Sequence, residues 1–195
     1  MHTYATHHSL PGSSDGFSLS ELLATVAIVA IVTTVGLPML RGFIDDAAVS
    51  SAADRMLASL NYTRSEAVKR NTRVTMCRSA GGAGCDAASA AGDWRGGWII
   101  FVDGGDAGAY DDGDEILRVE GELSGSAMLL GTGAVADYVS YASTGQARLA
   151  DGSGQAGVIA ACVASPGIRR RKIALTAGTG WVGVDIVAGS ADCTS

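Results

Sequence analysis

A long apolar run near the start of the chain gives way to a one-sided pattern and then to short apolar stretches. No residue from Leu22 to Leu40 carries a formal charge, and a helix of about 20 apolar residues spans the hydrocarbon core of a bilayer. After Arg41 the apolar residues recur at helical spacing, at Ala53, Met56, Leu57, Leu60 and Ala67. The pattern predicts one helix from Phe17 to about Arg70, apolar on all sides at first and on one side later.

Short stretches rich in strand-forming residues follow Asn71, and glycine-containing connections separate nearly all of them. They are Arg73–Arg78, Trp98–Val102, Ile116–Val119, Ala127–Leu130, Tyr138–Tyr141, Gly157–Ala164, Arg170–Thr176 and Trp181–Val187. Because these stretches follow one another without intervening helices, we expect an antiparallel sheet whose apolar face packs on the helix. The predicted fold class is α+β, with a long N-terminal helix and a β-rich head.

Composition narrows the choice of partners. The 195 residues, 47% of them hydrophobic, suffice for one ordinary core. The formal charge of −6 disfavours nucleic acid and acidic membrane surfaces as partners unless positive charge gathers locally.

The four cysteines form no C-x-x-C pair, and the only histidines are His2, His7 and His8. These spacings do not fit a zinc site, so we expect disulfides formed in an oxidising compartment. Four cysteines allow three pairings. We favour Cys77–Cys85, which closes a short glycine-rich loop, and Cys162–Cys193, which fastens the C-terminal tail to a strand.

Glu21 lies directly before the apolar run. An ionisable group costs about 2.5–3.5 kcal/mol at the centre of a bilayer and less toward the interface, so a lone Glu21 would be expected at the water interface. A cleaved secretory signal is an alternative, although residues 1–16 contain no Lys or Arg. A carboxylate in apolar surroundings is tolerated when a cationic amine lies within hydrogen-bond reach.

The N-terminal region contains Gly16-Phe17, Glu21 and the apolar run from Leu22-Leu23 to Gly36-Leu37-Pro38. With these features it resembles the class III signal of type IV prepilins and pseudopilins. The resemblance implies that a prepilin peptidase cuts between Gly16 and Phe17 and that Phe17 becomes N-methylated. It also implies that Glu21 pairs with the terminal amine of a neighbouring subunit during filament assembly.

Four further stretches resemble the GspH/FimT family of minor pilins and minor pseudopilins. They are Leu60–Arg70, Val74–Cys77, Trp94–Asp103 and Asp114–Arg118. The resemblance implies a leader at 1–16, a transmembrane half-helix at 17–41, an amphipathic half-helix at 42–70 and a periplasmic head at 71–195. It also implies a structural subunit that primes or caps a type IV pilus or a type II secretion pseudopilus. The expected partners are other minor pilins or pseudopilins, the major subunit, prepilin peptidase and the bacterial inner membrane.

Two alternatives to that role stay open on the sequence. One is a DNA-binding minor pilin for natural transformation, in which the basic run Arg169, Arg170, Arg171 and Lys172 would contact phosphates. In an extended strand, however, only two of these four side chains would share a surface. The other is a simple anchored periplasmic protein, which would keep its N-terminus.

Enzymatic and metal-binding functions find little support. All three histidines precede Gly16, so the processed chain would contain no histidine to act as a base or a ligand. The acidic stretch 103–115 favours a solvated hairpin loop, with calcium binding as the alternative. The stretch Gly178–Gly183 matches G-x-G-x-x-G but precedes a strand, which indicates a hairpin. We expect no enzyme activity, no cofactor and no metal.

Overall fold

The computed structural model describes residues 16–86, 92–164, 167–187 and 193, and the side chains of 35–39 lie outside the description. The chain divides into two units, residues 1–40 and 41–195, which are described separately. One helix, α1 (Leu19–Arg70), takes in parts of both units. Eight strands follow it in the second unit, as predicted, with small differences at their ends.

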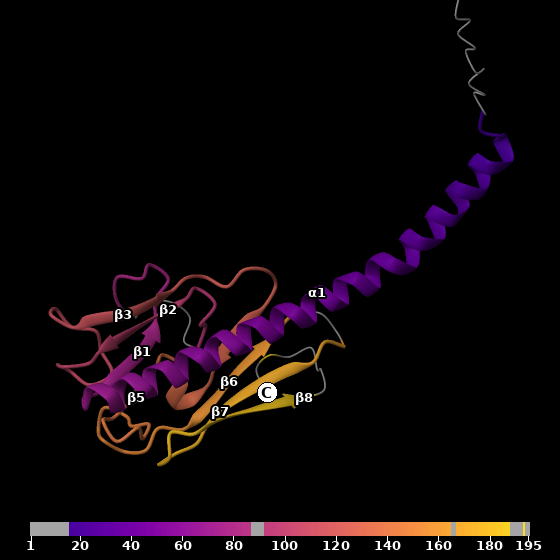
Figure 1. The fold of residues 1–195 in the computed structure, drawn as a ribbon. Coiled ribbons are helices and arrows are strands. Elements are labelled where there is room, and N and C mark those ends of the chain that lie inside the picture. The colour runs from indigo at the N-terminus through magenta and orange to yellow at the C-terminus, as the bar shows by residue number, and fades with distance from the viewer. Residues whose placement is uncertain (1–15, 87–91, 165–166, 188–192, 194–195) are drawn as a thin grey trace, which may run out of the picture. The chain divides into compact units, whose positions relative to one another are not determined.

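The strands form two antiparallel sheets of four strands each (Figure 1). The first sheet has the order β3-β2-β1-β5. Its strands are β1 (Val74–Arg78), β2 (Trp98–Val102), β3 (Glu115–Glu120) and β5 (Tyr138–Tyr141). The second sheet has the order β4-β6-β7-β8. Its strands are β4 (Met128–Gly131), β6 (Gly157–Cys162), β7 (Arg170–Leu175) and β8 (Val182–Val187), and a short 3₁₀ helix, η1 (Gly133–Val135), lies between β4 and β5. The α+β fold is therefore confirmed, although the sequence did not reveal the division into two sheets.

The second half of α1 packs against both sheets through one face (Figure 1). Met56, Leu60 and Ala67 are fully or almost fully buried in the main core, together with Trp94 and Trp98. These helix residues are among those whose helical spacing predicted a buried face. Burial of such side chains contributes about 1.5–3 kcal/mol each for the larger ones, so this face holds the helix on the head.

A capping motif ends α1 and leads directly into the first sheet. Asn71 has a positive φ of 53°, a conformation that asparagine tolerates better than most residues. The amide of Asn71 donates to the Val68 carbonyl at 3.3 Å, and the amide of Thr72 donates to the Ala67 carbonyl at 3.2 Å. This pair of bonds satisfies the last carbonyls of the helix, and β1 begins only two residues later.

Ion pairs fasten the edge strand β3 to α1. Arg55 lies 3.0 Å from Glu120, and Arg70 lies 2.9 Å from Glu115. The guanidinium of Arg118 lies over the ring of Tyr62, 5.6 Å from its centroid. Charged side chains therefore cover this edge of the first sheet.

Candidate functional site

The described chain begins at the residues expected to form the processing and assembly site. The helix starts at Leu19, so Ser18 occupies the capping position. The amide of Glu21 donates to the Ser18 hydroxyl at 3.3 Å. An acidic residue three positions after a serine cap is favoured by the positive end of the helix dipole. Glu21 thus has a local role at the helix start in addition to the role that the sequence suggested.

The sequence signal of this cap is the Ser-x-x-Glu spacing of Ser18 and Glu21. Both Phe17 and Glu21 are exposed, Phe17 to 82%. Their backbone and side chains are therefore accessible in the single chain. Cleavage after Gly16, methylation of Phe17 and an intermolecular role of Glu21 all stay predictions.

The first turns of α1 are apolar on every side. Large side chains at 22, 23, 26, 28, 29, 31 and 32 are each more than half exposed. At 100° per residue these positions are distributed around the whole circumference of the helix. The helix therefore has no polar face between residues 22 and 32. The predicted span Leu22–Leu40 includes residues 35–39, whose side chains are not described.

Among the residues that the structure describes, no helix is both long enough and apolar enough to cross a membrane.

Both predicted disulfides form in the head. The Cα atoms of Cys77 and Cys85 lie 5.5 Å apart, and those of Cys162 and Cys193 lie 5.9 Å apart. Cys77 belongs to a small cluster with Ile99 and Phe101 on the first sheet, separate from the main core. The first bridge therefore holds a loop on that cluster, and the second bridge ties the tail to β6.

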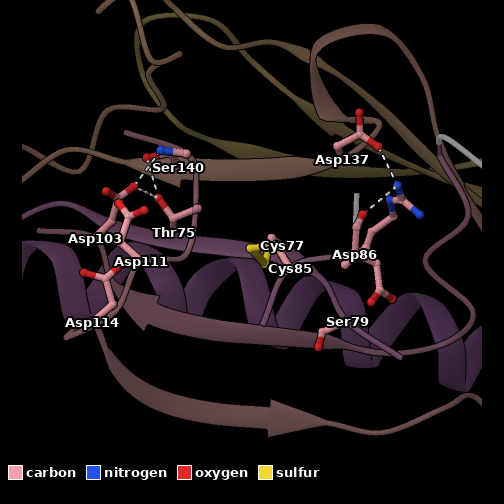
Figure 2. The surroundings of a disulfide bond; sticks show 12 residues. Thr75, Cys77, Ser79, Cys85, Asp86, Asp103, Asp111, Asp114, Asp137 and Ser140 are labelled. Carbon is pink, nitrogen blue, oxygen red and sulfur yellow. Dashed lines mark hydrogen bonds and ion pairs between the residues drawn. A yellow bond between two sulfur atoms is a disulfide. The ribbon is translucent and has the colours of Figure 1, made fainter. Parts of the chain in front are cut away.

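Polar side chains flank the Cys77–Cys85 bridge, as Figure 2 shows. On one side the Thr75 hydroxyl donates to Asp103 at 2.5 Å and also lies 2.8 Å from the Ser140 hydroxyl. On the other side the buried Arg78 lies 2.7 Å from Asp137. Burial raises the pKa of the Asp103 carboxyl above its usual value, although the Thr75 hydrogen bond opposes that shift. The network joins β1 to β5 and to the loop after β2.

The acidic loop after β2 uses its carboxylates to bind its own backbone. The amides of Gly104 and Asp111 donate to Asp114 at 3.1 and 3.0 Å, and the amide of Asp106 donates to Asp111 at 2.8 Å. Within the ranges that the structure describes, no three metal-ligating side chains converge. The loop is a hairpin connection between β2 and β3, as predicted.

The basic run does not form one exposed cluster. Arg169 lies 3.4 Å from Asp46 of α1, and Arg170 is only 6% exposed at the start of β7. Arg171 and Lys172 are half-buried. The burial of Arg170 and the ion pair of Arg169 divide the run, and DNA binding by these residues stays a prediction.

The motif Gly178–Gly183 lies in the predicted hairpin, with residues 178–181 in the turn between β7 and β8 and the last two residues in β8. Gly178 and Gly180 have φ values of 79° and 65°, which glycine adopts without strain. A Cβ on Gly180 would also collide with the Gly145 carbonyl. The second glycine therefore serves a tight turn against a neighbouring loop.

Comparisons with known proteins agree with this architecture. The model of a family described as type II transport protein GspH matches residues 52–180, about two thirds of the chain. The chain belongs to the GspH family. The match includes α1 from residue 52 onward and the strands β1 to β7, and it ends before β8 begins. No curated protein sequence matches the chain.

Two solved structures resemble this GspH-family chain, and both are crystal forms of the type IV minor pilin FimU from Pseudomonas aeruginosa. One has a TM-score of 0.55 and 19% identity, and the alignment covers 73% of this chain and 92% of FimU. The other has a TM-score of 0.50 and 19% identity, with 70% and 91% covered. At this identity the likeness shows the fold. The family predicted from the sequence is confirmed by the match of the family model.

Proposed function

We propose that this GspH-family chain is a structural minor pilin or pseudopilin subunit that primes or caps a type IV pilus or a type II secretion pseudopilus. The observation that carries the proposal is a helix whose first turns are apolar on all sides, continuous in sequence with a disulfide-bonded head. An apolar helix surface of this kind is covered either by lipid or by other helices. In a subunit that is first held in a membrane and then packed into a filament, lipid covers this surface first and other helices cover it later.

In this proposal each part of the N-terminal region has a separate task. A prepilin peptidase removes residues 1–16, and Phe17 then carries the new amine. Residues 22–40 hold the subunit in the inner membrane until it is extracted. Glu21 pairs with the terminal amine of an adjacent subunit, because a carboxylate in an apolar bundle is stabilised by a cationic partner. The disulfides support a head that lies in the oxidising periplasm.

The test combines N-terminal mass spectrometry with assembly. The chain is expressed in its host, and the membrane-extracted protein is expected to begin at an N-methylated Phe17. Glu21→Val should leave cleavage intact and abolish incorporation into the filament. Ser18→Ala is the matched control, because it removes the hydroxyl that caps the helix without removing the carboxylate. Retention of residues 1–16 in the functioning cell, or equal defects in the two variants, would contradict the proposal.

A further inference from the structure

The four edge strands of the two sheets differ in how their outer edges are protected or covered. The edge strand β3 carries Glu115, Arg118 and Glu120 and is bound to α1 by ion pairs. Its pairing with β2 is also irregular between Ile100 and Phe101. Charges and bulges of this kind protect an edge from pairing with another chain.

Neighbouring chain segments cover two more edges. Beside β4, the amide of Trp94 donates to the Leu129 carbonyl at 2.9 Å, and the amide of Gly131 donates to the Gly92 carbonyl at 2.7 Å. Beside β5, the amide of Arg148 donates to the Ser140 carbonyl at 2.9 Å. Backbone groups on these two edges therefore already have partners.

The edge of β8 is different. β8 pairs with β7 on one side, and no segment among the described residues pairs with its other side. An edge strand directs the N–H and C=O groups of alternate residues outward. On its inner face Val184 is 37% exposed and Ile186 is 57% exposed, although both lie in line with the partly buried Val182. β8 therefore combines open hydrogen-bonding groups with an uncovered apolar strip.

Cys193 is tied away from this edge. Cys193 is bonded to Cys162 of β6, and β7 lies between β6 and β8. Strands lie about 4.8 Å apart in a sheet, so the disulfide holds Cys193 about two strands inward from β8.

The existing neighbour of β8 indicates which chemistry fits the open side. In the β7–β8 register Lys172 lies opposite Asp185, and Ile173 lies opposite Val184. Asp185 is exposed, and no ion pair to it is found within the described ranges. A strand on the second edge would meet the same alternation, with Val184 and Ile186 on one face and one carboxylate on the other.

We propose that β8 is a docking edge that pairs with an extended strand of another subunit of the same assembly. The partner strand runs antiparallel to β8, places apolar side chains against Val184 and Ile186, and places a lysine or arginine opposite Asp185. Main-chain hydrogen bonds supply the affinity, and the alternating side chains supply the register. The identification of the partner as a fellow subunit rests on the proposed function, whereas the chemistry of the edge does not.

The probe is a synthetic peptide with the sequence of β7, Arg-Arg-Lys-Ile-Ala-Leu, added to the full chain in detergent. Backbone hydrogen exchange, followed by mass spectrometry, should slow across 182–187 as the peptide saturates and stay unchanged across β3. Replacing the peptide lysine by glutamate should weaken binding by up to about fivefold, the size of a cross-strand charge pair. Asp185→Lys should restore binding of the glutamate peptide and weaken binding of the lysine peptide.

The matched control is Asp112→Lys, which makes the same change of net charge at an exposed position of the acidic loop. It should leave both peptides unaffected. Absence of slowed exchange at 182–187, or equal effects of the two lysine variants, would overturn the proposal. Slowed exchange at β8 that depends on protein concentration without peptide would assign the edge to a second copy and would also overturn it. None of these outcomes involves N-terminal processing, so a failure here is distinct from a failure of the proposed function.

Discussion

The two disulfides should differ in how much they stabilise the head, because they close loops of different length. Cys77 and Cys85 are 8 positions apart, and Cys162 and Cys193 are 31 positions apart. In the chain-entropy model, closing such loops in the unfolded chain stabilises the fold by about 2.5 and about 3.7 kcal/mol. Cys77 and Cys162 are both almost fully buried, so the packing lost on replacement by alanine is similar. The expected difference is therefore about 1.2 kcal/mol.

The assay is guanidinium unfolding of the full chain in detergent, followed by tryptophan fluorescence. Trp94 and Trp98 are fully buried in the main core, so their emission reports unfolding of the head. Replacement of Cys162 and Cys193 by alanine should cost more than replacement of Cys77 and Cys85. Equal losses, or a larger loss on removing the short loop, would refute the loop-length reasoning. Such a result would place the main effect in the folded state, through the cluster around Cys77.

Two further substitutions test packing and charge in the head. Gly131→Ala should destabilise the head by about 1–3 kcal/mol, because a Cβ there would lie 2.7 Å from Trp94 Nε1. Gly121→Ala should be nearly neutral, because no atom lies within 4 Å of a Cβ at that position. Similar melting temperatures of the two variants would contradict this reasoning. A hydrogen bond from Arg70 lowers the pKa of Glu66 below its ordinary value of 4.5. The ionised carboxylate of Glu66 therefore stabilises the folded head above that pH, and this contribution is lost as the pH falls. Glu66→Gln should therefore flatten the acid side of the stability profile, and an unchanged profile would count against the ion pair.

The local pattern of residues was sufficient to predict where the helix and the strands of this fold lie in the chain. Short runs of strand-forming residues between glycine-containing connections predicted Trp98–Val102 and Tyr138–Tyr141 with the same ends that the structure shows. The helical spacing of Met56 and Leu60 predicted the buried face of α1. These features depend on neighbouring residues, which the sequence displays directly.

The arrangement of the strands depends on distant residues and was not readable in the same way. β1 pairs with β5, more than sixty positions later in the chain, and no local periodicity encodes such a partner. Gln155 is another example. It is fully buried and accepts from the Ser140 amide at 2.9 Å, while its side-chain amide donates to the carbonyls of Ala134 and Tyr138. A single glutamine in a glycine-rich loop carried no signal of this role.

The residues proposed for processing and assembly at the N-terminus were accessible to sequence reasoning for a different reason. Gly16, Phe17 and Glu21 form a short linear motif, so their spacing is visible without a fold. The open edge of β8 was not, because exposure of Val184 and Ile186 depends on what the rest of the chain leaves uncovered. A linear motif is defined by the order of neighbouring residues, whereas an exposed surface is defined by how distant segments pack.

The cap at Asn71 also determines how the head would respond to mechanical load. The chain passes from α1 to β1 through only three residues, and β1 is an inner strand, paired with β2 on one side and β5 on the other. Tension on the helix would therefore reach the middle of a sheet and would act along strands that are bonded on both flanks. Pulling the helix off the head would therefore require breaking the packing of α1 in the core as well as the hydrogen bonds of β1 on both flanks.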